Sequence, residues 1–249
     1  MRKLLLFLAG MMIFSISYAQ LSVSDSLKNH YQKTYQQALQ YNDINVAVNS
    51  LQNIIAEIHG KNEMLMKDTL AMLYFASKSY YSALLLSKEV YQSNPSNINA
   101  LARAAECYQN LGDAKNAIAD YETVTPVLKN PYYYYQLAAC QYELKRYAEC
   151  ETNISKVLAD TSSNRIGVVF TLPNGNEQQI PASAAVLNMK AVMRMDIKNY
   201  AEAKSYLENA LKIFPDFEGA KQNLSYCNDS LKTPKPAKSL SENKTKGKG

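Results

Sequence analysis

The side chains that could perform acid–base, nucleophilic or metal chemistry are few in this 249-residue chain, and they form no catalytic pattern. The two histidines, His30 and His59, lie near no cysteine or serine motif, and no glycine-rich phosphate loop occurs. Glu149 and Glu151 flank Cys150, but residues two apart do not share a helix face. The sequence therefore predicts a protein that is not an enzyme and that has no catalytic residue and no cofactor.

The cysteines also match no metal pattern. They are Cys107, Cys140, Cys150 and Cys227. The first three fall where the helical pattern described below requires small or medium apolar residues, which favours buried thiols and predicts no metal site. A disulfide between Cys107 and Cys140, or between Cys140 and Cys150, is the alternative in an exported protein, because connectivity cannot be read from sequence.

The first 19 residues have the pattern of a cleaved secretory signal peptide. Arg2 and Lys3 precede a short apolar run from Leu4 to Ile16, and Ser17-Tyr18-Ala19 offers small residues at the cleavage site. A membrane anchor is the disfavoured alternative, because the run is too short to span a bilayer comfortably and no stop-transfer pattern follows. We therefore expect a bacterial-type protein exported across the inner membrane, in the periplasm.

The excess of positive charge comes from the two ends of the chain. The formal net charge is +5, but without Arg2, Lys3 and residues 232–249 the chain has 19 basic and 21 acidic side chains. This body gives no case for a nucleic-acid surface. Residues 232–249 lack apolar periodicity and are predicted to be a disordered basic tail. The tail is either a solubilising terminus, which we favour, or a weak contact to an anionic membrane surface.

The elements that must position these side chains repeat with a period of about 34 residues, which indicates a helical solenoid. The segment from Leu101 to Tyr108 recurs from Leu137 to Tyr142, and each copy is followed by a break and a second amphipathic stretch. The pattern predicts a solenoid over residues 20–231 with a capping helix at about Asp216 to Leu231. Its five helical hairpins run approximately from Lys28 to Lys61, Met64 to Asn97, Ile98 to Pro131, Tyr132 to Asp160 and Ala184 to Phe217.

Small residues mark the expected contacts between the two helices of a hairpin. Ala71 and Ala83, Ala105 and Ala117, and Ala191 and Ala203 are each 12 residues apart, so each pair should meet at equal depth on facing helices. The tyrosines Tyr74, Tyr108 and Tyr142 are expected to fill the space between hairpins. Pro95, Pro131 and Pro215 are expected to end second helices.

With these features the chain resembles the tetratricopeptide repeat (TPR) family, best from Met64 to Pro131 and from Ala184 to Phe217. The family hallmarks present are the paired small residues, the aromatic residue three places after the first, and the closing proline. Tryptophan is absent, and Arg194 replaces the spacer tyrosine of the last repeat. The resemblance covers about three quarters of the chain and implies an all-α solenoid of about five TPR-like hairpins, suited to binding along a groove.

Residues 161–183 interrupt the helical period. Alternation from Ile166 to Leu172, followed by Pro173-Asn174-Gly175, predicts an inserted β-hairpin in which Phe170 faces Gln178 and Val168 faces Ile180. We expect it to cover a junction between repeats, with Phe170 buried near Val186 and Met189. A lid over the groove, or an edge strand that a partner extends, is the alternative.

In the TPR arrangement the first helix of each hairpin lines a concave groove, and this predicts the partner-binding residues. The single inward arginine, Arg103, disfavours the carboxylate clamp of chaperone-binding TPR domains. The run from Tyr132 to Tyr135 is either a recognition platform or packing around a helix start. The predicted partner-binding residues are Leu65, Asp68, Met72, Phe75, Asn99, Glu106, Gln109, Tyr133, Gln136, Glu143, Asn188 and Met195.

The repeats, the signal pattern and the missing catalytic groups together favour a non-catalytic scaffold of the cell envelope. Such a scaffold would bind an extended segment of another protein, or a partner protein, in its groove. An accessory subunit of an envelope enzyme or of an assembly or secretion complex is the alternative. A hydrolase is a third and weaker class, because no residues for it were found.

Overall fold

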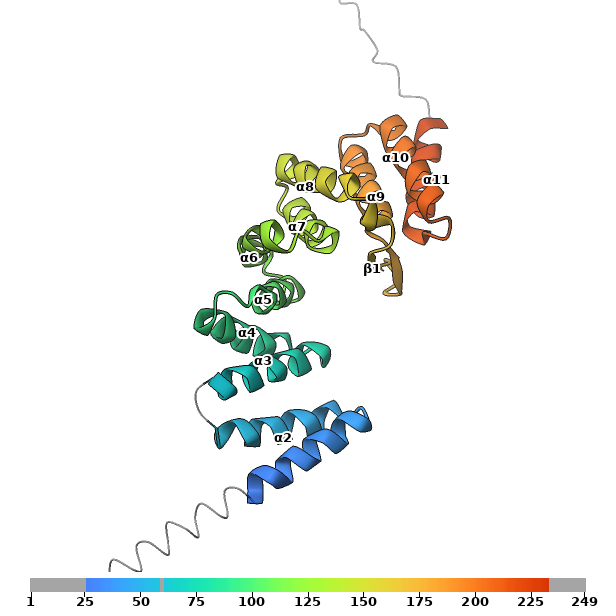
Figure 1. Ribbon diagram of the computed structural model, residues 1–249. Helices are drawn as coiled ribbons and strands as arrows, with labels where there is room; N and C mark the ends of the chain where they lie inside the picture. The colour runs from blue at the N-terminus through green and yellow to red at the C-terminus, as the bar shows by residue number, and fades with distance from the viewer. Residues whose placement is uncertain (1–25, 59–60, 233–249) are drawn as a thin grey trace, which may run out of the picture. The chain divides into compact units, whose positions relative to one another are not determined.

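The computed structural model describes residues 26–58 and 61–232, and these residues are almost entirely helical (Figure 1). The predicted signal peptide and the basic tail after Lys232 lie outside the described residues. Residues 26–40 form a first helix. The elements that follow are α2 (Ile44–Ala56), α3 (Lys61–Ala76), α4 (Tyr80–Ser93), α5 (Ile98–Asn110), α6 (Ala114–Leu128), α7 (Pro131–Glu143), α8 (Tyr147–Ala159), the 3-10 helix η1 (Thr161–Asn164), β1 (Gly167–Thr171), β2 (Glu177–Pro181), α9 (Ala182–Asp196), α10 (Tyr200–Ile213) and α11 (Glu218–Lys232).

These elements form two compact units, divided between Arg146 and Tyr147. The first unit contains the helices up to α7, and the second contains α8 to α11 with the two strands. In both units, helices adjacent in sequence pack against each other: α3 with α4, α4 with α5, α5 with α6, α9 with α10, and α10 with α11. Within the described ranges, no helix combines the length and apolar character needed to cross a bilayer.

Every break between the paired helices uses the same backbone turn. One residue adopts a left-handed conformation, and the amide that follows it donates to a carbonyl five residues earlier, as from Asp113 to Tyr108 (2.9 Å). This bond satisfies a carbonyl that the helix end would leave without a partner. Glycine adopts this conformation without strain, but only one of the five turns uses it. The left-handed residues are Asn42, Lys78, Gly112, Lys145 and Lys198.

The paired alanines lie where the sequence places them. Ala71, Ala83, Ala105, Ala117, Ala191 and Ala203 are all fully buried. Methyl side chains let the two helix backbones of a hairpin approach closely, which larger residues would prevent. Their burial is as predicted, and Ala105 and Ala117 belong to the same buried cluster.

Tyrosines pack beside these contacts in the first unit. Tyr74 and Tyr108 both pack against a buried cluster built from α4 and α5, which contains Ala83 and Cys107. Tyr108 also packs against the cluster that joins α5, α6 and α7. The predicted role of these two tyrosines as filling between hairpins is confirmed.

Prolines end helices at two of the three predicted places. α4 ends two residues before Pro95, and α10 ends two residues before Pro215. The third prediction is wrong: α6 ends at Leu128 with left-handed Lys129, and Pro131 is the first residue of α7. A proline suits that place because the first amides of a helix have no partner within the helix, and Asn130 caps the next one.

The inserted hairpin has the predicted register. Val168 pairs with Ile180 and Phe170 with Gln178, and Gly175 at the turn has a φ of 85°. Val168 and Ile180 are each 1% exposed, because the strands pack on α9. The hairpin therefore belongs to the core of the second unit, which confirms the packing interpretation.

The contact predicted for Phe170 is wrong. Its ring is half-buried and lies edge-on to Phe217 with a centroid separation of 4.9 Å. Gln178 continues this contact, since its amide donates to the carbonyl of Asp216 (2.5 Å) and its oxygen accepts from the amide of Glu218 (3.1 Å). The strand twist carries the far end of the hairpin past α9 to the start of α11, so Phe170 meets that helix.

All four cysteines are free and buried. The disulfide alternatives are therefore not formed, and the apolar positions in the repeats are occupied by thiols. Burial raises the pKa of Cys107, Cys140 and Cys150 to about 12 in each case, because a thiolate would lose its hydration there.

Replacing Phe170 by Ala should lower the free energy of unfolding by about 2–3 kcal/mol, since a half-buried aromatic contact with Phe217 is lost. Val169 precedes it on the same strand but points outward and is 57% exposed, so Val169→Ala should change stability by less than about 0.5 kcal/mol. Urea unfolding followed by circular dichroism measures both. Equal effects of the two substitutions would contradict the packing of the hairpin on α11.

Gly219→Ala tests the same contact from the other side. A Cβ at Gly219 would lie 2.6 Å from Cε1 of Phe170, so the substitution should destabilise the protein by about 1–2 kcal/mol although alanine is the better helix former. In a Phe170→Ala background only the 3.1 Å approach to Cε2 of Phe217 remains, so Gly219→Ala should then destabilise the protein much less. A double-mutant cycle in urea that finds the two effects additive would refute the contact.

Candidate functional site

Polar side chains on the first helices of the hairpins connect α3 to α5 in the first unit. The guanidinium of Arg103 pairs with the carboxylate of Asp68 and donates from Nε to the hydroxyl of Ser87 (2.8 Å). Asn97 donates from Nδ2 to Oδ2 of Asp68 (3.0 Å), while its oxygen caps α5 by accepting from the amide of Ala100. Arg103 of α5 thus contacts both α3 and α4.

A second set of polar contacts connects α5 to α7. The hydroxyl of Tyr132 donates to Oε2 of Glu106 (3.0 Å), and Gln109 donates from Nε2 to Oε1 of Gln136 (3.1 Å). The buried Tyr121 of α6 donates to the oxygen of Gln109 (2.8 Å). The predicted binding residues Glu106, Gln109 and Gln136 therefore do lie together, but their polar atoms join neighbouring helices.

Burial of Glu106 changes the pKa of its carboxyl group. Desolvation raises the pKa of this carboxyl, and the hydrogen bond from Tyr132 and the charge of Arg103 oppose the shift.

The side chains of the tyrosine run are half-buried, and burial raises the pKa of Tyr135 to about 12. Tyr133 packs in the core beside Tyr121. Tyr132 and Tyr133 therefore take part in the packing around the start of α7.

A groove of about 600 Å³ opens where α3 begins, α4 ends and the connection to α5 passes. We call it the α3–α5 groove. Its apolar lining includes Leu65, which is 62% exposed and is the most accessible apolar side chain of α3. The lining residues are Asn62, Glu63, Met64, Leu65, Asp68, Val90, Ser93, Asn94 and Asn97.

The predicted binding residues divide into four groups in the structure. Leu65 and Asp68 line the α3–α5 groove. Met72, Asn99 and Glu143 are exposed elsewhere on the first helices, whereas Glu106, Gln109 and Gln136 form the contacts described above. The remaining four are half-buried or buried: Phe75 against Tyr80, Tyr133 in the core, Met195 on α9, and Asn188, which is 4% exposed and accepts from Asn223.

Only Leu65 and Asp68 of the groove lining are among the residues predicted from the sequence. Val90 and Ser93 come from the end of a second helix, and Asn94 and Asn97 from the connection that follows it. The signal that could have found them is the polar segment Asn94-Pro95-Ser96-Asn97, which separates two well-matched repeats.

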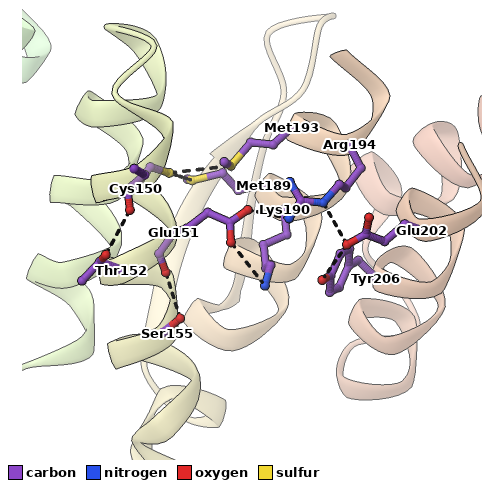
Figure 2. A network of polar contacts seen from close by, with 11 residues as sticks. Cys150, Glu151, Thr152, Ser155, Met189, Lys190, Met193, Arg194, Glu202 and Tyr206 are labelled. Carbon is purple, nitrogen blue, oxygen red and sulfur yellow. Dashed lines mark hydrogen bonds and ion pairs between the residues drawn. The ribbon is translucent and has the colours of Figure 1, made fainter. Parts of the chain in front are cut away.

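The second unit has an ion-pair network at the position of the missing spacer tyrosine (Figure 2). Arg194 of α9 pairs with Glu151 of α8 (2.6 Å) and with Glu202 of α10 (2.9 Å), and Tyr206 donates to Glu202 (3.1 Å). Arg194 lowers the pKa of Glu202 by hydrogen bonding and by its charge. One cation thus joins three helices where an aromatic ring would fill the space between them.

In residues 26–58 and 61–232, no three side chains of His, Cys, Asp or Glu gather as a metal site would require. The charged groups of the α3–α5 groove are largely paired, Glu63 with Lys67 (2.7 Å) and Asp68 with Arg103. The groove therefore offers an apolar side chain beside neutralised polar groups.

Comparison with known proteins agrees with this architecture. The model of the anaphase-promoting complex, cyclosome, subunit 3 family matches residues 76–157, and a tetratricopeptide repeat model matches residues 184–217. None of the curated proteins matches the sequence.

Several solved structures share the fold at low sequence identity. A tetratricopeptide repeat protein from Parabacteroides merdae ATCC 43184 is 14% identical with a TM-score of 0.65, and the match covers 83% of this chain and 74% of that one. MamA from Desulfovibrio magneticus RS-1 is 12% identical (TM-score 0.61; 77% and 97% covered). YrrB, described as a TPR protein with an unusual peptide-binding site, is 12% identical (TM-score 0.60; 77% and 89% covered).

The chain is a tetratricopeptide-repeat protein with an all-α fold and an inserted β-hairpin. This confirms the resemblance and the fold class that were inferred from the sequence.

Glu106→Gln should stabilise the protein at about pH 8 and have less effect at about pH 4. The raised pKa of Glu106 means that the folded state holds this proton more tightly than the unfolded state. The contribution of Glu106 to the free energy of unfolding is therefore most favourable at low pH, and it is lost as the pH rises through the folded-state pKa. The amide is neutral and its oxygen still accepts from Tyr132. Urea unfolding at both pH values measures the difference.

Glu143→Gln is the matched control, because Glu143 is an exposed glutamate at the end of α7. It should leave stability unchanged at both pH values. Destabilisation by Glu106→Gln at about pH 8 would contradict this prediction. It would show that the hydrogen bond from Tyr132 and the charge of Arg103 stabilise the carboxylate by more free energy than its burial costs.

Proposed function

We propose that this protein is a non-catalytic scaffold for protein–protein interaction and that the α3–α5 groove binds a short extended segment of a partner. TPR repeats are in general non-catalytic interaction modules, which supports the first part. The observation that carries the second part is the exposed Leu65 at the edge of a groove whose charged groups, Glu63 and Asp68, are paired. Exposed apolar surface beside a polar rim is typical of binding sites.

The size of the groove favours a segment over a folded domain. Its volume of about 600 Å³ lies within the range of ligand sites, about 300–1,000 Å³. Such a volume can hold a few side chains of an extended chain. A peptide-binding site is also described for YrrB, which shares the fold.

The rigidity of the groove supports the same proposal. Arg103, Asn97 and Asp68 form a connected network beneath it, so a partner does not have to order these side chains on binding. Because the charges are paired, the partner segment should be anchored by an apolar side chain. Asn62, which is exposed on the rim, is available for hydrogen bonds to a peptide backbone.

We also propose that the protein works outside the inner membrane. The support is the sequence pattern of residues 1–19, which lies outside the described residues. A partner in the cell envelope is then expected, and the basic tail remains a solubilising segment under this proposal.

Leu65→Asp should weaken binding of the partner segment by about 10- to 100-fold, the equivalent of an apolar anchor of about 1.5–3 kcal/mol. Stability should hold, because the side chain is mostly exposed. A phage-displayed peptide library selected on the wild-type protein supplies the ligands, and titration of the enriched peptides measures affinity. Leu85→Asp is the matched control: Leu85 is 55% exposed on α4 and lies outside the groove lining.

Enriched peptides that bind both variants equally would overturn the assignment of the groove. Pull-down from envelope extracts tests the wider role. A stable stoichiometric complex that persists with Leu65→Asp would instead indicate the accessory-subunit function.

A further inference from the structure

Three sulfur atoms converge between α8 and α9 in the second unit (Figure 2). The thiol of Cys150 lies 3.7 Å from Sδ of Met189 and 3.8 Å from Sδ of Met193. The two methionines are four residues apart on α9, so they lie on one helix face. Cys150 is fully buried and Met193 is 5% exposed.

Hydrogen bonding does not explain all of this arrangement. The thiol of Cys150 has one proton, so it can donate to only one of the two thioethers at a time. The contact between Cys150 and the other methionine sulfur then has no proton between the two atoms. A cation placed among the three sulfurs would interact favourably with all of their lone pairs.

The separations suit a three-coordinate metal. With metal–sulfur bonds of about 2.3 Å, a metal at the centre of three sulfurs places them about 4.0 Å apart. The two separations from the Cys150 thiol, 3.7 Å and 3.8 Å, lie close to this value, so neither thioether has to move far relative to the thiol to share a metal with it.

We propose that Cys150, Met189 and Met193 form a binding site for Cu(I). Two thioethers beside one thiolate select this soft ion over zinc, whose sites are built from thiolate, imidazole and carboxylate ligands, and over magnesium and calcium, which prefer oxygen donors. The sulfur ligands leave the oxidation state unchanged: Cu(I) displaces the thiol proton of Cys150 to solvent and forms a copper–thiolate bond, and the two thioethers donate lone pairs.

The charge balance fits a buried site. The thiolate and Cu(I) cancel, and the thioethers are neutral, so the occupied site places no net charge in the apolar interior.

The site also has an approach from solvent. A smaller groove of about 290 Å³ is lined by Tyr147, Ala148, Glu151, Met193, Arg194 and Ile197, and so reaches one of the three ligands. Glu151 is the acidic group at this groove, although Arg194 and Lys190 contact it. Met193 is thus the ligand through which an ion would first make contact.

Sequence patterns gave no indication of this site, because metal patterns are recognised from cysteine and histidine spacing. Here the ligands come from two helices separated by the inserted hairpin. Only the packing of α8 on α9 brings the single thiol to the pair of thioethers.

Anaerobic titration of the full-length mature protein with Cu(I), in competition with bicinchoninate, tests the proposal. We expect one Cu(I) to bind, with sulfur-only coordination and bond lengths of about 2.3 Å in X-ray absorption. Cys150→Ala should abolish this binding, and Met189→Leu and Met193→Leu should each weaken it by at least 10-fold. Methionine to leucine conserves volume, so these two variants should keep the fold. Ag(I), which is not oxidised in air, should raise the Tm of the wild type but not of Met193→Leu.

Matched controls separate this site from other sulfur atoms. Met195→Leu changes a methionine on the same helix, and Cys227→Ala removes another buried thiol of the second unit. Both should bind Cu(I) as the wild type does. The proposal is overturned if the wild type takes up no Cu(I), or if Met189→Leu and Met193→Leu bind it unchanged. Either result would show that the three sulfurs only fill the core.

Discussion

The structure depends on the close approach of two helices at buried alanines. Where small side chains share a buried cluster, as Ala105 and Ala117 do, the backbones of α5 and α6 can pack tightly and a short turn can join them. Left-handed residues make that turn possible, and four of the five are lysine or asparagine in place of glycine. Close packing therefore compensates for local backbone strain, because the contacts beside each turn stabilise one conformation.

Once each hairpin is compact, larger side chains determine how it meets the next one. In the first unit, tyrosines fill this space, and their hydroxyls and neighbouring amides connect the helices, as Tyr132 does with Glu106. In the second unit, Arg194 replaces the tyrosine and joins α8, α9 and α10 through two carboxylates. An ion pair is directional, so it specifies the helix arrangement more strictly than a ring contact.

Binding surfaces arise where this packing leaves a group unused. Asp68, Asn97 and Arg103 contact one another, so the accessible lining of the α3–α5 groove is apolar at Leu65 and polar at Asn62, Ser93 and Asn94. In the second unit the packing of α8 on α9 excludes water from Cys150 and places two thioethers beside it. Both candidate sites are therefore results of helix packing, and neither is a local sequence motif.

The sequence by itself determined the repeats, their alanine contacts, the breaks between helices, and the register of the inserted hairpin. These features follow from periodicity and from short-range turn geometry, which act within a few residues of each position. Only the tertiary structure decided that Phe170 meets α11, that Pro131 begins a helix, that Gln109 and Gln136 bind each other, and where the groove opens. Those outcomes depend on which surfaces meet after the helices pack, and the spacing of residues along the chain does not contain that information.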